Sequence, residues 1–175
     1  NAHFAVALLQ NIKSNHYDAI AQCKLLANRY HESPLTPFAL LYSSSIKTEL
    51  HDYTGAREDL EQLIQQYPEC ELSEQACLNL ADIHMKAGLN GQAVSLYQKV
   101  YNLGASRSSQ LRAALGAGKC FYIGKRYEAA QKWVNRYIKL TIESPDDNLY
   151  TAYFLLGKTY LALEKAEPAA EALKL

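Results

Sequence analysis

A pattern of small and apolar residues recurs along this chain about every 37 residues, and it restricts the fold more than any other feature. Five alanines mark the pattern, and each begins a helical run of apolar residues: Ala19, Ala56, Ala93, Ala130 and Ala169. Twelve residues before each alanine stands a small residue: Ala7, Ser44, Ala81, Gly118 and Gly157. Small residues allow two helix axes to approach closely, so each unit is predicted to be a pair of packed helices.

Polar or glycine-containing turns separate the two helices of a unit, at residues 15–16, 51–52, 88–90 and 124–125. No segment shows the alternation of apolar and polar residues that is typical of strands. The chain is 49% hydrophobic and 21% charged, which is an ordinary globular composition. A helix pair this short cannot bury its apolar face alone, so neighbouring units must stack. The sequence therefore predicts an all-α solenoid in a single domain, residues 1–175.

The first helices carry the motifs Leu156-Gly157-x-x-Tyr160 and Ala117-Gly118-x-x-Phe121, and the second helices carry Ala56, Leu60 and Pro68 with their counterparts. This pattern resembles the tetratricopeptide repeat (TPR), although its period is longer than the ~34 residues of that family. The resemblance implies a right-handed superhelix of about five helix–turn–helix repeats, at approximately 1–33, 34–70, 71–106, 107–145 and 146–175. The turns at Tyr67-Pro68 and Tyr30-His31 resemble the Tyr-Pro-x-Ser turn of bacterial TPR proteins, some of which assemble the cell envelope.

The two ends of the sequence suggest a fragment of a longer protein, because the chain starts without Met and stops within an apolar pattern. The compartment stays open between the cytoplasm and the bacterial periplasm or cell envelope. No apolar run approaches the ~20 residues of a membrane span. The four cysteines lack metal-ligand spacing and are expected to be mostly buried free thiols, with a Cys70–Cys77 bridge as the alternative.

No motif for catalysis or cofactor binding is present in the sequence. The five histidines are scattered along the chain. Asp146 and Asp147 follow a proline and indicate a helix start, where carboxylates are favourable, rather than a catalytic or metal-binding pair. We therefore expect no enzyme, no cofactor and no metal site.

The first helices of TPR proteins line a concave groove, so the resemblance implies a partner-binding groove in this chain. The implied groove residues are Phe4, Leu8, Phe38, Leu41, Leu78, Asp82, Met85, Arg112, Leu115, Lys119, Tyr122, Phe154 and Lys158. Their mixture of an apolar floor and adjacent polar groups is typical of peptide sites. The alternative is that the apolar row only packs one first helix against the next. Lysines are present but the accompanying asparagines are missing, so the terminal-carboxylate clamp of chaperone TPR domains is not expected.

The charges are divided along the chain, although 18 basic and 18 acidic residues give a net charge of zero. Residues 1–85 hold 5 basic and 11 acidic side chains, whereas residues 86–175 hold 13 basic and 7 acidic ones. Residues 86–142 hold 10 basic residues and one acidic residue, Glu128. The division indicates two solvated faces of opposite sign, steering of a partner with the opposite division, or head-to-tail self-association.

These observations together predict a non-catalytic scaffold or adaptor that binds a peptide segment or partner protein, with acidic groups, in the concave groove. One alternative is anion or nucleic-acid binding through the basic repeats, residues 86–142. Lys132, Arg136 and Lys139 fall on a second helix, so the basic residues are not expected to form a single strip. The other is a non-catalytic arm of a larger enzyme or envelope-assembly protein.

Overall fold

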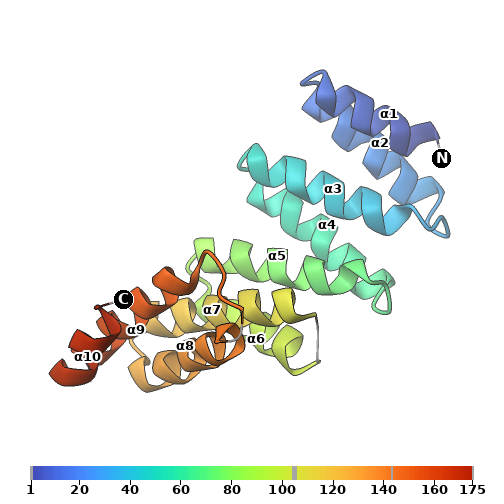
Figure 1. The fold of residues 1–175 in the computed structure, drawn as a ribbon. Helices are drawn as coiled ribbons and strands as arrows, with labels where there is room; N and C mark the ends of the chain where they lie inside the picture. Colours follow the sequence, from blue (N-terminus) through green and yellow to red (C-terminus); the bar gives the residue numbers. More distant parts are fainter. Residues whose placement is uncertain (1, 104–105, 143, 175) are drawn as a thin grey trace. The chain divides into compact units, whose positions relative to one another are not determined.

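The computed structural model describes residues 2–103, 106–142 and 144–174, and within these ranges the chain forms helices and no strand (Figure 1). The helices are α1 (Ala2–Ile12), α2 (His16–Arg29), α3 (Thr36–Glu49), α4 (Tyr53–Gln66), α5 (Leu72–Lys86), α6 (Asn90–Asn102), α7 (Arg107–Ile123), α8 (Tyr127–Thr141), α9 (Leu149–Ala162) and α10 (Ala166–Ala172). The prediction of an all-α fold is confirmed.

Five equivalent turns join each odd-numbered helix to the helix that follows it. In every one of these turns a residue adopts a positive φ of 57–75°; these residues are Ser14, His51, Gly88, Lys125 and Glu164. Only one of the five is glycine, the residue that adopts this conformation most easily. The turn residues are about 37 residues apart, so the backbone repeats with the period of the sequence.

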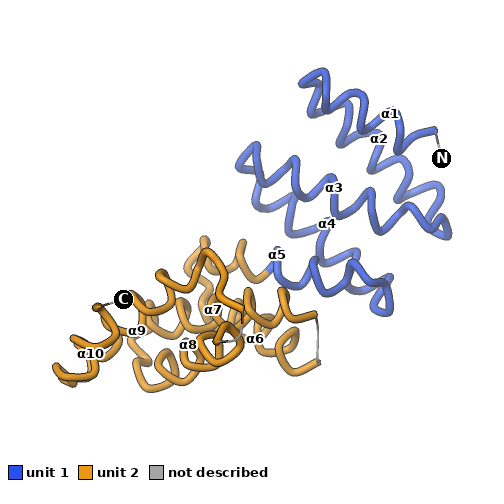
Figure 2. The backbone as a smooth tube through the Cα atoms, in the orientation of Figure 1, with its two compact units in different colours: residues 1–80 blue, residues 81–175 orange. Residues whose placement is uncertain are grey.

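The contacts within the chain divide it into two compact units, residues 1–80 (unit 1) and residues 81–175 (unit 2), with the division inside α5 (Figure 2). In unit 1, α1 packs on α2, α2 on α3, and α3 on α4. In unit 2, α6 packs on α7, α7 on α8, α8 on α9, and α9 on α10. Contact between successive helices is the packing expected of stacked repeats.

The small residues that mark the repeat are all buried, as close helix packing requires. A Cβ atom added to Gly118 on α7 would lie 2.8 Å from Val134 Cγ2 on α8. A Cβ atom added to Gly157 on α9 would lie 2.5 Å from Leu173 Cγ, just beyond α10. These helix pairs therefore have no room for a larger side chain at the repeat's small position.

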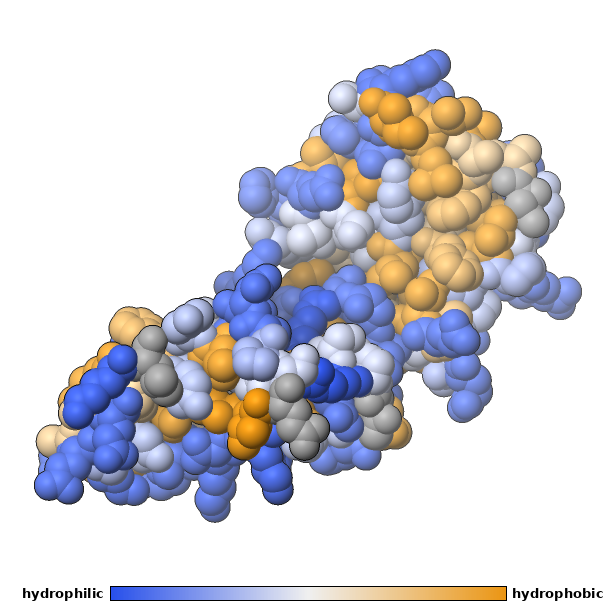
Figure 3. Space-filling model, in the orientation of Figure 1, coloured by the Kyte–Doolittle hydropathy of each residue, from blue (hydrophilic) through white to orange (hydrophobic). Residues whose placement is uncertain are grey.

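One core cluster of unit 1 joins α1, α2 and α3 and consists of Ala7, Cys23, Leu26 and Ala39, with Phe4, Leu35 and Tyr42 packed against them. The inter-repeat turns are joined by hydrogen bonds. The Tyr67 hydroxyl donates to the His31 carbonyl oxygen at 2.5 Å, and the Thr36 hydroxyl donates to the Tyr30 carbonyl oxygen at 2.7 Å. Figure 3 shows hydrophobic residues on the surface of unit 1 in this view, and α1 exposes Val6, Leu8, Leu9 and Ile12.

The cysteines are free thiols, so the alternative of a Cys70–Cys77 bridge is wrong. Cys23, Cys77 and Cys120 are buried, and Cys70 is partly exposed. Burial raises the pKa of the Cys23 thiol to about 12 and that of the Cys120 thiol to about 11. Because the thiolate is the reactive form, these two thiols react slowly in the folded protein.

We expect Ellman's reagent to modify only Cys70 rapidly in the folded protein at pH 8, and to modify all four thiols in guanidinium chloride. The Cys70→Ser variant should remove the rapid phase and leave the total in denaturant one thiol lower. Rapid modification of any thiol in the folded Cys70→Ser variant would contradict the burial of Cys23, Cys77 and Cys120.

Candidate functional site

Unit 2 contains two adjoining cavities that share the side chains of Met85, Lys86 and Lys119. The first, here the polar cavity, has a volume of about 680 Å³ and is lined from α5 to α8 and by the segment that follows α8. The second, here the apolar cavity, has a volume of about 360 Å³ and is lined from α5, α7 and α9. Together they form the groove of unit 2, whose lining comes mainly from α5, α7 and α9.

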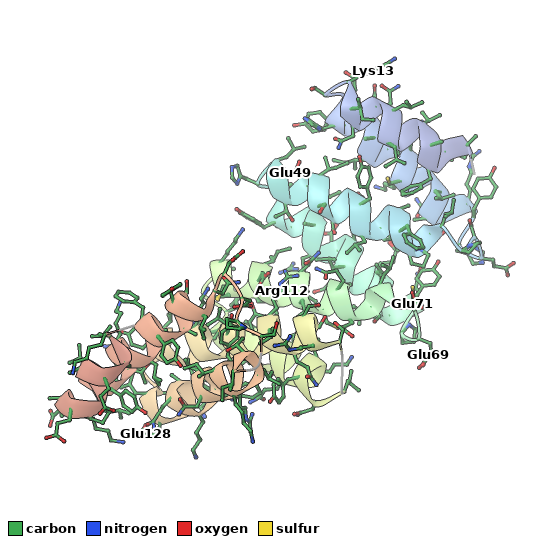
Figure 4. All side chains as sticks on the ribbon, in the orientation of Figure 1. Lys13, Glu49, Glu69, Glu71, Arg112 and Glu128 are labelled. Atoms are coloured by element: carbon green, nitrogen blue, oxygen red, sulfur yellow. The ribbon has the colours of Figure 1, made fainter. Side chains whose placement is uncertain are left out.

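A carboxylate on α5 organises one side of the polar cavity. Asp82 accepts a hydrogen bond from the Tyr97 hydroxyl on α6 and forms an ion pair with the Arg112 guanidinium on α7. Arg112, labelled in Figure 4, thus joins α7 to α5. Tyr97 is fully buried. Burial raises the pKa of its hydroxyl above the usual range and the Asp82 charge raises it further, so the hydroxyl remains a donor.

A second carboxylate faces the polar cavity from the segment between α8 and α9. Asp146 accepts hydrogen bonds from the Tyr137 hydroxyl and from the Asn148 backbone N–H, the latter at 3.1 Å. Burial and this hydrogen bond raise the pKa of the Tyr137 hydroxyl, which therefore stays protonated. The Arg107 guanidinium on α7 donates to the carbonyl oxygens of Leu140 at 2.7 Å and Ser144 at 3.0 Å. These bonds hold the end of α8 and the segment after it against the start of α7, and so position Asp146.

The apolar cavity combines hydrophobic walls with amines. Its apolar lining is Met85, Tyr122, Ile123, Phe154 and Leu155, and its cationic lining is Lys86, Lys119 and Lys158. The Lys158 amine lies 5.4 Å from the ring centroids of both Tyr122 and Phe154. Among the residues that the structure describes, no aspartate or glutamate lines this cavity.

All eight groove residues predicted in residues 81–175 line one or both cavities: Asp82, Met85, Arg112, Leu115, Lys119, Tyr122, Phe154 and Lys158. The guanidinium of Arg112, one of these predicted groove residues, forms an ion pair with Asp82. Leu115 is 6% exposed and contributes mainly to packing.

The five groove residues predicted in unit 1 are in different environments. Leu8 is 38% exposed and Phe38 is 46% exposed, whereas Leu41 is partly buried. Phe4 packs against Tyr42, with 6.0 Å between the ring centroids. Leu78 is 1% exposed, so its side chain is a core residue and is not accessible to a ligand. For Leu78, the alternative that the apolar row serves packing agrees with this burial.

Sequence reasoning missed several residues that line the cavities, among them Lys86, Tyr97, Tyr137 and Asp146. We expected Asp146 to be a helix-start residue. A usable signal was Tyr97, because it occupies a position where other repeats carry an apolar residue without a hydroxyl group, such as Leu60 and Val134. A buried hydroxyl requires a hydrogen-bond partner, and here that partner is Asp82.

Comparison with protein families identifies the repeat. A profile described as tetratricopeptide repeat matches residues 48–110 and 78–148, and a second profile with the same description matches residues 150–175. The chain belongs to the tetratricopeptide repeat family. The prediction of an α-solenoid of TPR repeats is therefore confirmed. A search of curated proteins finds no match.

Solved structures of TPR proteins resemble this chain in fold. A MamA crystal structure has a TM-score of 0.82 at 15% identity, covering 99% of this chain and 87% of MamA. The apo form of RapI has a TM-score of 0.87 at 11% identity, covering 98% of this chain and 51% of RapI. YrrB, titled a TPR protein with an unusual peptide-binding site, has a TM-score of 0.75 at 16% identity, covering 98% and 81%. At these identities the likeness shows the fold alone.

The described residues contain no group of three histidine, cysteine or acidic side chains placed to hold a metal ion. Among the same residues, no helix combines the length and the apolar character that crossing a membrane requires. The groove of unit 2 combines a hollow surface with charged side chains and the exposed ring of Phe154.

Proposed function

We propose that this TPR domain is a non-catalytic scaffold or adaptor that binds a segment of a partner protein in the groove of unit 2. The observation that carries the proposal is the continuity of the two cavities, which share Met85, Lys86 and Lys119. Ligand sites are hollows of roughly 300–1,000 Å³ with mostly apolar walls and a few placed polar groups. Both cavities fall within that range, and together they match an extended or helical segment better than a compact small molecule.

The family supports a protein partner, because TPR solenoids present extended binding surfaces. YrrB, which shares the fold, is titled by its peptide-binding site. The side chains that line this groove differ from a clamp for a terminal carboxylate, because Asp82 already pairs with Arg112 and apolar residues form the second cavity.

Nucleic-acid binding through residues 86–142 is the less favoured function. Lys132, Arg136 and Lys139 lie on α8 and line neither groove cavity. The Arg136 guanidinium covers the Trp133 ring at 4.3 Å from its centroid, and Trp133 is itself only 6% exposed. A ring in this position packs within the protein and offers no platform on which a base would stack.

Head-to-tail self-association is an alternative that rests on the division of charge between residues 1–85 and 86–175. Such contacts join two different surfaces of neighbouring copies, so the assemblies become larger as the protein concentration rises. Sedimentation velocity at two salt concentrations tests it: a species that enlarges with concentration only at low salt supports charge-driven assembly, and a monomer throughout excludes it.

The proposed function is tested by capture from nuclease-treated lysate of the source cells on the immobilised chain, followed by mass spectrometry. Three forms are compared: the wild type, Phe154→Ala and Tyr150→Ala. Both aromatic residues are exposed on α9, but only Phe154 lines the groove. We expect the specific protein held by the wild type and by Tyr150→Ala to fall about tenfold or more with Phe154→Ala, because exposed aromatic anchors dominate binding energy.

Equal capture by all three forms would place the binding surface outside the groove and overturn the proposal. Circular dichroism of the variants controls for folding, since α9 must remain helical for the comparison to hold. Retention of nucleic acid alone, when the nuclease is omitted, would favour the basic repeats as the functional surface.

A further inference from the structure

The size and the walls of the apolar cavity determine what enters it. Its volume of about 360 Å³ lies at the lower end of the range for ligand sites. Phe154 and Ile123 are 58% and 57% exposed, so their apolar surface is offered to a partner instead of being used in the core. A cavity of this size accommodates one large side chain, together with the chain that carries it.

The charges around this cavity have one sign. The amines of Lys86, Lys119 and Lys158 line it, and no carboxylate from residues 2–103, 106–142 or 144–174 does. Within the described part of the chain, no aspartate or glutamate lies within ion-pair distance of Lys119 or Lys158. The neighbouring cation Arg112 differs, because Asp82 already neutralises it. Lys119 and Lys158 are thus the groove cations whose charge is left for a ligand.

Hydrophobic contact and unpaired cations favour the same kind of ligand. We propose, on the basis of the proposed function, that the groove selects acidic protein segments that carry one large apolar residue. That apolar side chain enters the apolar cavity against Phe154, Tyr122 and Met85. Carboxylates on either side of it pair with the amines of Lys119 and Lys158. A basic segment is repelled by the same lysines, so the lysines provide specificity as well as affinity.

The polar cavity presents two carboxylates, and their surroundings differ. Its two carboxylates are each already bound by a tyrosine hydroxyl, Asp82 by Tyr97 and Asp146 by Tyr137. Asp82 is also paired with the Arg112 guanidinium, whereas the donors to Asp146, a tyrosine hydroxyl and a backbone N–H, carry no charge. Like charges repel, so the acidic residues of the segment are expected at the apolar cavity, beside Lys119 and Lys158.

The test is selection of a random peptide library, displayed on phage, against the whole chain, followed by affinity measurement on the selected peptides by fluorescence anisotropy. We expect the selected peptides to carry aspartate or glutamate on both sides of one phenylalanine, leucine or tryptophan. The affinity should fall about tenfold or more in the variant Lys119→Glu/Lys158→Glu, because attraction becomes repulsion. It should fall less in Lys119→Gln/Lys158→Gln, which only removes the charges.

The matched control is Lys132→Glu/Lys139→Glu, which makes the same change in net charge at exposed sites on α8 outside both cavities. This control should keep the wild-type affinity to within about twofold at ~0.15 M salt, where distant surface charges are screened. Thermal unfolding of each variant separates loss of binding from loss of folding.

Each outcome decides between the two proposals. Selected peptides without acidic residues, or equal binding by the Lys119→Glu/Lys158→Glu variant, overturn the inference about the ligand and leave the groove as a peptide site. A single-stranded DNA oligonucleotide held by Lys119 and Lys158, with no peptide selected, overturns the inference in favour of nucleic acid. If the wild type selects no peptide and Phe154→Ala captures as much protein from lysate as the wild type, both the proposed function and the inference about the ligand are overturned.

Discussion

Replacement of Gly116 by alanine is expected to destabilise unit 2 by about 1–3 kcal/mol, the usual range for inserting a group into a filled core. Gly116 lies on α7 and lines the polar cavity. A Cβ atom there would lie 2.5 Å from Cζ, 2.7 Å from Cε1 and 2.8 Å from Cε2 of the Tyr97 ring. The ring cannot move aside freely, because it is fully buried and its hydroxyl is bound to Asp82.

The control for this experiment is a second helical glycine, Gly91 on α6. A Cβ atom added there meets nothing within 4 Å, and Gly91 is exposed. Alanine in a helix is favoured over glycine by up to ~1 kcal/mol, so Gly91→Ala should be neutral or slightly stabilising. The same substitution thus has opposite effects at two sites, and the Tyr97 ring is the cause of the difference.

Urea unfolding followed by circular dichroism measures both variants. Repeat proteins can unfold in parts, so near-ultraviolet circular dichroism of the tyrosines should accompany the far-ultraviolet signal. If Gly116→Ala is as stable as Gly91→Ala, the ring of Tyr97 is not held where the structure places it. The ion pair of Asp82 with Arg112 would then also lose its support.

Most of the fold follows from the repeated small residues, because close packing of two helices requires a small residue at the contact. The small residues at Ala7, Ser44, Ala81, Gly118 and Gly157 were predicted to lie between packed helices, and all are buried. A larger residue would separate the helix axes, so this position tolerates little variation and its period is visible in one sequence. The equivalent turns, each with one residue at positive φ, follow the same period.

The groove was predictable in position but not in chemistry. Repeat offsets placed residues such as Met85, Lys119 and Phe154 on the correct helices, and these residues line the two cavities. The offsets could not show that Asp82 neutralises Arg112, because that depends on side-chain conformations in two neighbouring repeats. Nor could they show that Leu78, at the same offset as Leu115 and Phe154, is 1% exposed while Phe154 is 58% exposed.

Counting charges along the sequence also hides pairs that the fold brings together. The count of charged residues treats Lys47 and Asp59 of unit 1 as two separate solvated charges. In the structure they form an ion pair between α3 and α4. The Lys47 amine lies 2.7 Å from Asp59 Oδ2, and the side chains are only 14% and 15% exposed. The amine also donates to the Gly55 carbonyl oxygen at 3.3 Å. This pair therefore belongs to the interior of unit 1 and contributes nothing to its surface charge.

Breaking this pair from one side should destabilise unit 1 by about 2–4 kcal/mol for Lys47→Met. The substitution leaves a mostly buried carboxylate without its cation, and removal of one partner from a fully buried pair costs about 3–5 kcal/mol. The lower figure allows for the remaining exposure of the two side chains. Asp59→Leu should be costly for the same reason, since the lysine amine is then left without its anion.

The double variant Lys47→Met/Asp59→Leu should recover most of the loss and lie within about 1–2 kcal/mol of the wild type. Replacement of a buried ion pair by apolar residues of similar volume is often neutral, because two desolvated charges disappear together. A double-mutant cycle of urea unfolding measures the coupling. Additive effects of the two single changes would show that the two side chains do not interact and that each is solvated on its own.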